Sequence, residues 1–201
     1  NLEETKSIAK KLIKINKQRQ QQEEKIYQEA ENKIENINLE IEKSIILFDT
    51  EWHSGIIGIV ASRLLEKYNL PVILFAVDKE KGTAKGSARS ISSLNIYQAL
   101  KHCQSKVLNF GGHKAAAGLS IESSEIEGFK DEFKEYLFKN LTEEDYFKRK
   151  RIDLNLDISR LSKEFISSLE KFRPFDIANR TPKFLFRNLK SRQNYQMDKK
   201  N

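Results

Sequence analysis

Hydrophobic positions near the start of the chain recur every three or four residues, which is the period of an amphipathic helix. They fall into two groups, residues 8–15 and residues 26–37, and residues 16–25 between them are almost wholly polar. Neither glycine nor proline occurs in residues 1–38, so helix propensity predicts one helix that continues through the polar stretch. A helix that is polar on all sides cannot be buried there, and residues 1–43 are therefore predicted to connect two bodies.

The pattern changes at residue 44, where a βαβ unit is predicted. Residues 44–48 form an apolar run of strand length, and hydrophobic positions in residues 57–68 step at helical spacing. Ser54 stands where a helix N-cap is expected. Residues 72–77 are a second apolar run, which indicates a buried strand. Strand, helix and strand in this order are typical of an α/β fold.

The rest of this domain alternates short elements with small-residue segments. The predicted elements are a surface strand or loop at 82–89, a short helix at 97–103, a glycine-bounded loop at 110–118, a short strand at 119–121 and a closing amphipathic helix at 126–137. A charge-dense stretch over residues 143–151 then predicts a domain boundary.

A second, smaller domain is predicted beyond that boundary. Hydrophobic and polar residues alternate strictly over 152–158, which indicates a half-buried strand. A short helix at 161–172 follows, and Phe184 and Phe186 alternate as a further strand. Residues 191–201 show no pattern and are predicted to be a disordered tail, so the second domain is expected to be truncated.

Composition narrows the class of protein. The 201-residue chain is 38% hydrophobic and 32% charged, so a core can form. No apolar run approaches the roughly 18 residues of a membrane span, and residues 1–11 lack the apolar segment of a signal peptide. The single cysteine, Cys103, excludes an internal disulfide and fits a reducing compartment. We expect a cytoplasmic protein without a membrane partner. Because the chain begins with Asn1 and has its only methionine at Met197, we also expect a piece of a longer protein.

The net charge of +7 is concentrated in the last third of the chain. Residues 1–44 carry nine basic and nine acidic side chains, residues 45–140 twelve and eleven, and residues 141–201 fifteen and nine. A concentrated basic segment favours a polyanion partner. An ordinary solvated surface explains the charge equally well.

No self-contained catalytic centre emerges from the residue spacing. The three histidines, His53, His102 and His113, have neither His-x-x-x-His spacing nor a cysteine pair nearby. Asp49 and Glu51 are close in sequence, but such pairs at a strand end are more often surface charges. Cys103 lies on an apolar helix face and is interpreted as a small core residue.

Three segments rich in small residues are better candidates for a ligand site. Residues 52–58 open the predicted helix, where free N–H groups favour an anion, although helix–strand packing needs small residues too. Ser87 and Arg89 lie two apart, so on a strand they face the same way and can grip a phosphate; an ordinary edge strand is the alternative. Residues 111–118 place glycines on both sides of His113, so the backbone can lie flat against a ligand. A lone loop histidine is more often merely exposed, and it is the joint occurrence that favours a site.

These motifs together resemble the RecJ family of bacterial single-strand-specific 5′→3′ DNA exonucleases, within the DHH phosphoesterase superfamily. The resemblance rests on Trp52-His53 with the Gly-Ile-Val-Ala-Ser-Arg-Leu run that follows, on Gly-Ser-Ala-Arg-Ser and on Gly-Gly-His-Lys-Ala-Ala-Ala-Gly. It implies an α/β fold class with a DHH-associated substrate-binding domain at 44–141, in which helices flank a mixed sheet. Residues 1–43 are then the connector from the catalytic domain, and residues 150–190 a truncated OB-fold domain for nucleic acid. In that last segment Asp176 and Ala178 replace two glycines of the family's turn.

The resemblance also implies roles for particular residues. Ser87 and Arg89 are expected to hold the 5′-phosphate of the DNA strand, and His113 to contact the substrate. The other expected substrate-binding residues are Trp52, His53, Gly86, Gly111 and Gly112. The family's Mn²⁺ or Mg²⁺ is held by its DHH domain, and no Asp-His-His motif occurs in this chain. We therefore expect neither a metal site nor a catalytic residue here, and a chain that binds without cutting.

The implied partners are single-stranded DNA with a 5′-phosphate and a catalytic DHH domain in cis, acting in DNA repair and recombination. Two alternatives remain. One is a small-nucleotide phosphoesterase of the same superfamily, acting on oligonucleotides or cyclic dinucleotides, but such proteins usually end after the associated domain. The other is a non-catalytic nucleic-acid or tRNA-binding module, since alanyl-tRNA synthetases carry a related domain. The sequence upstream of Asn1 would discriminate among them.

Overall fold

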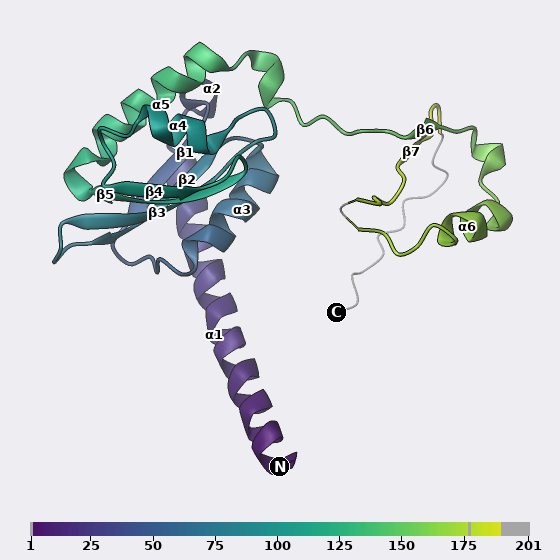
Figure 1. Cartoon of the computed structure of the whole chain (residues 1–201), viewed down its shortest axis with the longest axis horizontal. Coiled ribbons are helices and arrows are strands. Elements are labelled where there is room, and N and C mark those ends of the chain that lie inside the picture. The colour runs from purple at the N-terminus through teal and green to yellow at the C-terminus, as the bar shows by residue number, and fades with distance from the viewer. Residues whose placement is uncertain (1, 177, 190–201) are drawn as a thin grey trace. The chain divides into compact units, whose positions relative to one another are not determined.

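The computed structural model describes residues 2–176 and 178–189, and the chain divides into two compact units between Lys148 and Arg149 (Figure 1). This division falls within the charge-dense stretch at which the sequence predicts a boundary. Among the described residues, no helix combines the length and the apolar character that crossing a membrane requires. The predicted tail at 191–201 lies outside the described residues.

The predicted connector is two helices rather than one. Helix α1 covers Leu2–Ile34, and a short helix α2 follows at Leu39–Glu42. The side-chain oxygen of Asn38 accepts a hydrogen bond from the backbone N–H of Glu40 at 3.1 Å and so caps α2. Asparagine favours caps over helix interiors, which is why the helical run breaks there without any glycine or proline.

Only the second half of α1 packs on the first unit. Its buried residues are Ile26, Ala30 and Ile34, whereas Ile8, Leu12 and Ile15 in the first half are exposed. Figure 1 shows this first half projecting away from the sheet. The polar stretch between the two groups is solvated, as the sequence predicts.

Arg63 of helix α3, Ile57–Tyr68, attaches α1 to the body. Its guanidinium donates to Glu23 at 3.2 Å and to Glu24 at 3.0 Å, and it lies 3.9 Å from the centre of the Tyr27 ring. One arginine therefore engages three side chains that lie within about one turn of α1. Contacts of this kind fix the direction in which α1 leaves the unit.

A five-stranded sheet in the order β1-β2-β3-β5-β4 forms the centre of the first unit. The strands are β1 (Ile45–Asp49), β2 (Val72–Asp78), β3 (Thr83–Arg89), β4 (Asn109–Gly112) and β5 (Ala116–Glu122). Strands β1 and β2 are parallel and joined by α3, which is the predicted βαβ unit, and the other pairs are antiparallel. The predicted α/β fold with a mixed sheet flanked by helices is confirmed.

Helices cover the two faces of the sheet unequally. Helix α4 (Ile96–His102) and helix α5 (Ile126–Asn140) lie on one face, and α3 with the end of α1 lies on the other (Figure 1). A 3₁₀ turn at Ser123–Glu125 leads into α5. The first face buries the larger set of aromatic side chains, and the second face leaves part of the sheet open, as described below.

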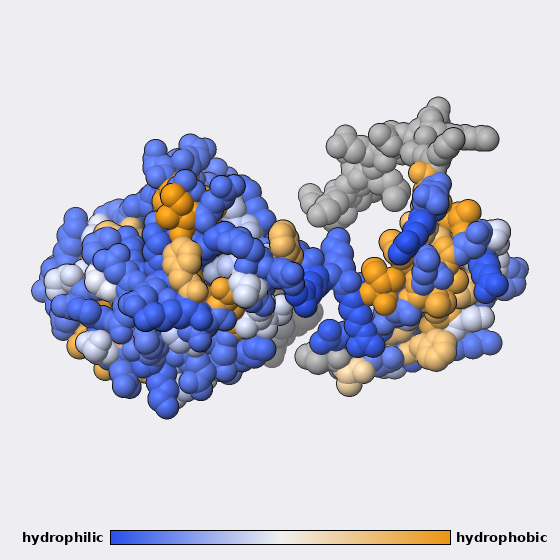
Figure 2. Space-filling view, turned by 90° about the horizontal axis from the view of Figure 1, so that it is seen from above, coloured by the Kyte–Doolittle hydropathy of each residue, from blue (hydrophilic) through white to orange (hydrophobic). Residues whose placement is uncertain are grey.

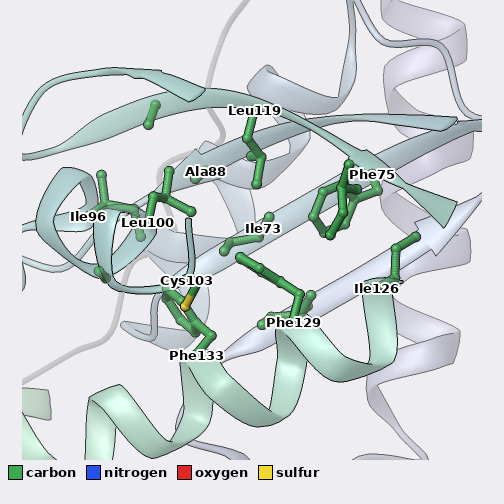
Figure 3. Packing of buried hydrophobic residues seen from close by; sticks show 14 of the residues in the cluster. Ile73, Phe75, Ala88, Ile96, Leu100, Cys103, Leu119, Ile126, Phe129 and Phe133 are labelled. Atoms are coloured by element: carbon green, nitrogen blue, oxygen red, sulfur yellow. The ribbon is translucent and has the colours of Figure 1, made fainter. Parts of the chain in front are cut away.

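The core beneath α5 is built around phenylalanine rings (Figure 3). Phe75 of β2 meets Phe129 of α5 edge-on with ring centres 5.9 Å apart, and Phe129 stacks on Phe133 at 5.7 Å. Cys103 is fully buried beside them, which confirms its interpretation as a core residue. Burial raises the pKa of the Cys103 thiol to about 12, so this group stays a protonated, unreactive thiol at neutral pH.

Two sequence expectations for the first unit are wrong. Ser54 does not cap α3; the N-cap position is Ile56, which makes no side-chain hydrogen bond. Of residues 110–118, only 113–115 form a loop, because β4 and β5 pair on either side of them as a hairpin with Phe110 opposite Leu119. Glycine and alanine fill the alternate positions, so the strand period was invisible to a pattern based on side-chain size.

The second unit contains short elements in its described part. They are β6 (Leu154–Asn155), a 3₁₀ turn (Ile158–Arg160), helix α6 (Lys163–Glu170) and β7 (Phe184–Leu185). A further 3₁₀ turn at Glu143–Tyr146 belongs to the first unit and precedes the boundary. Strand β6 pairs with β7 in parallel, and the strand predicted over 152–158 narrows to two residues. The OB-fold of residues 150–190 stays a prediction. Figure 2 shows hydrophobic residues at the surface of this unit. Its exposed hydrophobic residues include Ile166 and Phe172.

The α5 core gives a direct stability prediction. Phe133→Ala should lower the free energy of unfolding by about 3–5 kcal/mol, because the fully buried ring leaves a cavity between α5 and the sheet. Phe138→Ala, on the same helix but 56% exposed, should change it by about 0.5 kcal/mol or less. Urea titration followed by circular dichroism measures both. Equal losses for the two variants would contradict the placement of α5.

Candidate functional site

The open part of the sheet lies on the α3 face, beyond β3. Side chains alternate along a strand, so Ser87 and Arg89 project toward α3, whereas Ala88 between them is buried on the α5 side. Ser87 pairs with Gly118 of β5, and Gly118 pairs in turn with Gly111 of β4. These three residues form one row across the sheet, in which both glycines are exposed.

Gly118 and Gly111 leave a strip of sheet backbone without side chains, which we call the bare strip. The fold does not require glycine at either position. A Cβ atom on Gly111 would meet nothing within 4 Å, and one on Gly118 would meet only the carbonyl oxygen of Gly86 at 4.0 Å. Neither glycine has the positive φ that excludes other residues. Glycine inside a strand costs roughly 0.5–1 kcal/mol relative to alanine, so two unforced glycines side by side indicate that something approaches the backbone closely.

Arg89 stands at the edge of this strip and is held entirely by neutral oxygens. Its Nε donates to the Ser62 hydroxyl at 3.0 Å, and its Nη1 donates to the Ser87 hydroxyl at 3.0 Å and to the Ala88 carbonyl at 2.8 Å. Partial burial lowers the pKa of the Arg89 guanidinium, and no carboxylate opposes this effect. Arginine nevertheless stays charged at neutral pH, so a half-buried cation faces the strip without a counterion among the described residues.

His113 sits in the β4–β5 turn, at the same end of the sheet as Arg89, which pairs with Ala116. Gly112 makes this turn possible: its φ is +151°, and a Cβ there would lie 2.4 Å from the Ala116 carbonyl oxygen. The backbone N–H of Ala115 donates to Nδ1 of His113 at 3.3 Å. The neutral ring then carries its proton on Nε2, and the exposed ring can donate a hydrogen bond to a ligand.

His53 has the same local arrangement in the loop before α3. The backbone N–H of Gly55 donates to its Nδ1 at 3.1 Å, and the ring is exposed, so Nε2–H is again free to donate. The ring lines a groove that residues of α1, among them Arg19 and Lys25, share. His53 is therefore accessible to a ligand beside the root of the projecting helix.

Two residues that the sequence assigns to substrate binding also hold structural positions. Trp52 is only 4% exposed, and its Nε1 donates to the Glu29 carboxylate at 2.9 Å, which ties the loop before α3 to α1. Gly86 faces the α5 core, where a Cβ would lie 2.6 Å from both Phe75 and Leu119. Trp52 also lines a surface pocket with His53 and Lys85. The substrate-binding roles of Trp52 and Gly86 stay predictions.

Five of the expected substrate-binding residues thus lie at accessible or site-forming positions. They are His53, Ser87, Arg89, Gly111 and His113, with Gly112 shaping the turn. The structure adds three residues to this set: Gly118, Ser62 and Gly58. Gly118 and Ser62 were not assigned individual roles from the sequence, and Gly58 was included only as one of the small residues in the segment 52–58. The signal for Gly118 lay in the strand register with Gly111. Ser62 stands in the Gly-Ile-Val-Ala-Ser-Arg-Leu run that carries the resemblance, but no role of its own was assigned to it from the sequence.

The described residues do not form a binding site for the divalent metal that the family resemblance implies. Among residues 2–176 and 178–189, no three or more His, Cys, Asp or Glu side chains come together as metal ligands would. Residues near the site are hydroxyls, one guanidinium and separate histidines, which suit an anion better than Mn²⁺ or Mg²⁺. No chemical step through a metal follows from these residues.

Comparison with known proteins agrees with this architecture. The DHHA1 domain family matches residues 41–139. The single-stranded-DNA-specific exonuclease RecJ of Bacillus subtilis is 32% identical over 185 residues, which cover 92% of this chain and 23% of that protein. RecJ of Escherichia coli is 36% identical over 142 residues, covering 67% of this chain and 24% of that protein.

Solved structures give the same result. The crystal structure of Thermus thermophilus RecJ in complex with Mn²⁺ matches with a TM-score of 0.74 at 30% identity, covering 88% of this chain and 25% of that one. The Mg²⁺ complex of the same protein matches with a TM-score of 0.71 at 29% identity, covering 86% and 26%. The chain spans about a quarter of the length of the relatives that it matches.

The bare strip predicts an unusual response to mutation. Gly111→Ala and Gly118→Ala should each raise the free energy of unfolding by roughly 0.5 kcal/mol or more, because alanine restricts the unfolded chain and meets open space in the fold. Gly112→Ala should instead destabilise the protein, because of its φ and the contact with Ala116. Thermal and urea unfolding measure the three variants; destabilisation by Gly118→Ala would mean that the fold requires this glycine.

Proposed function

The chain carries a DHHA1 domain and is a homologue of the RecJ exonucleases, and on that premise we propose that it is the substrate-binding part of a single-strand-specific 5′→3′ DNA exonuclease. In this proposal the first unit grips the 5′-phosphate end of the strand. The second unit contributes further contacts to the phosphate backbone through its excess of basic side chains. The process served is DNA repair and recombination, in the cytoplasm.

The observation that carries the proposal is the state of Arg89. A half-buried guanidinium that is held by two hydroxyls and a carbonyl, with no carboxylate partner in the described part of the chain, keeps its full charge for a ligand. A terminal phosphate has two negative charges near neutral pH and several acceptor oxygens, so it fits this guanidinium and the Ser87 hydroxyl better than an internal phosphodiester does. Specificity for a phosphorylated end follows from that difference in charge.

The neighbouring surface suits a nucleotide attached to that phosphate. Gly118 and Gly111 leave the sheet backbone bare beside Ser87, so a sugar or a base can lie against it without meeting a side chain. His113 at the end of the strip has an Nε2–H that can donate to a second phosphate or to a base edge. The strand would then run along the row of paired glycines.

Cleavage is assigned in this proposal to a catalytic DHH domain in cis. The Thermus relative was crystallised with Mg²⁺ and with Mn²⁺, and we propose that the full-length protein uses one of these ions. The described residues of this chain do not form a metal site, so its part is to bind and orient the strand. The match to B. subtilis RecJ extends over 92% of the chain, which favours this proposal over a small-nucleotide phosphoesterase or a tRNA-binding module.

Replacement of Arg89 tests the end sensor. Arg89→Ala should weaken binding of a 5′-phosphorylated single strand roughly ten- to hundredfold, because a charge-assisted and bidentate contact is lost. Binding of the same strand with a 5′-hydroxyl should change little. Lys101→Ala, an exposed lysine on the opposite face, is the matched control for charge. Fluorescence anisotropy with both strands measures the effect, and equal losses for the two strands would show that Arg89 is not the end sensor.

Filling the bare strip should separate stability from binding. Gly118→Ala is expected to weaken binding of the phosphorylated strand by about fivefold or more, because the added methyl group stands where the nucleotide lies. The free energy of unfolding should not fall in the same variant. Ser120→Ala, one position further along the same face of β5, removes a polar group without adding bulk and is the control. Unchanged affinity in Gly118→Ala would place the strand elsewhere.

The division of labour between binding and cutting can be tested directly. The purified chain should release no nucleotides from a 5′-phosphorylated single strand in the presence of Mn²⁺ or Mg²⁺, since its described residues bring no three metal-ligating side chains together. The assay is denaturing gel electrophoresis of a 3′-labelled strand, with a full-length RecJ as the positive control. Metal-dependent shortening that follows the protein through purification would contradict this expectation.

A further inference from the structure

Ser62, in the middle of α3, uses both hydrogen-bonding functions of its hydroxyl. Its oxygen accepts the Nε–H of Arg89 at 3.0 Å, and its O–H donates to the carbonyl oxygen of Gly58, one turn earlier, at 3.0 Å. The second bond fixes the rotation of the hydroxyl, so the lone pair that receives Arg89 points in a direction set by the helix. Ser62 is thus a fixed acceptor on a rigid element.

Gly58 provides the space into which the Arg89 guanidinium fits. A Cβ on Gly58 would lie 2.9 Å from Nη2 of Arg89 and 3.0 Å from the Ser87 hydroxyl. Any other residue would therefore push the end of the arginine side chain away from α3. The two α3 residues act on the same group, one as an acceptor and the other by leaving room.

The neighbouring residue on α3 shows what a different acceptor would do. Arg63 is paired with two carboxylates, Glu23 and Glu24, and its charge is used to hold α1. Arg89 has hydroxyls where Arg63 has carboxylates. A neutral acceptor orients a guanidinium without cancelling its charge, whereas a carboxylate does both.

We propose that Ser62 is a positioning residue for Arg89, and that Gly58 is the small residue that lets the guanidinium seat against α3 in the orientation that receives a terminal phosphate. This inference rests on the proposed function, in which Arg89 binds the 5′-phosphate. It goes further by assigning the selectivity for the phosphorylated end to a neutral hydroxyl on a different element from Arg89 itself. The site then consists of β3 and α3 together.

The test compares binding of a short single strand with a 5′-phosphate and with a 5′-hydroxyl by the 201-residue chain. Ser62→Ala should reduce the preference for the phosphorylated strand about three- to tenfold, because one hydrogen bond that orients Arg89 is lost. Ser62→Thr, which keeps the hydroxyl, should retain the preference. Ser62→Asp should abolish it, because a carboxylate holds the guanidinium but neutralises it. Ser105→Ala, an exposed serine elsewhere in the same unit, is the control.

Gly58→Ala provides a second, independent variant. It should lose the preference to a similar extent while its unfolding midpoint is no lower than that of the parent. Alanine favours the helix, and only the side-chain ends of Arg89 and Ser87 must move. Loss of preference together with general unfolding would not support the inference; retention of the preference in Gly58→Ala or in Ser62→Ala would overturn it.

A measurement without DNA separates this inference from the proposed function. In the free protein, the Nε–H of Arg89 should give a ¹⁵N-resolved proton signal that exchanges slowly with water, and Ser62→Ala should speed that exchange at least severalfold. If Ser62→Ala does not change the exchange rate of this signal, the positioning role is wrong, whatever the DNA-binding measurements show. If the signal responds as expected but Arg89→Ala leaves the end preference of the parent intact, the phosphate function itself fails, and with it the assignment of selectivity to Ser62.

Discussion

A guanidinium seated against a helix by neutral oxygens is the interaction on which this site depends. It requires Arg89 and Ser87 to share one face of β3, a gap in α3 at Gly58, and an acceptor one turn later at Ser62. Burying a cation in this way costs solvation free energy that no carboxylate returns. The fold tolerates that cost because the opposite face of the same strand is packed against a fully formed core, so the strand cannot shift to relieve it.

Strand β3 therefore serves two different surfaces with alternate residues. Ala84, Gly86 and Ala88 are small because Phe75, Leu119 and the α5 rings fill the space above them. Ser87 and Arg89 point the other way, toward a helix that covers only part of the sheet. Segments rich in small residues thus have two causes here, dense packing on one side and access for a ligand on the other, and sequence alone does not tell them apart.

How far the sequence could predict the molecule depended on side-chain periodicity. The βαβ unit and α5 carry strong hydrophobic repeats and were predicted, and the two-residue spacing of Ser87 and Arg89 placed them together. The β4–β5 hairpin was missed because glycines occupy the paired outward positions Gly111 and Gly118 and interrupt the alternation of side chains. Trp52 was assigned to the ligand because its motif is characteristic of the family, yet its ring packs in the core on the α3 face and donates to Glu29 of α1, which lies 23 residues earlier in the chain. The role of Ser62 likewise rests on a tertiary contact, its hydrogen bond with Arg89.

The polar stretch of α1 also sets an angular relation. Eleven positions separate Ile15, the last exposed hydrophobic residue, from Ile26, the first buried one. At 3.6 residues per turn this interval is about three full turns with roughly 20° left over, so both stripes lie on nearly the same side of the helix. Any body that covers Ile8, Leu12 and Ile15 must then approach from the side on which α3 and the sheet lie. Inserting a single residue between the stripes would rotate that body by about 100° around the helix axis, whereas inserting seven would restore its bearing almost completely.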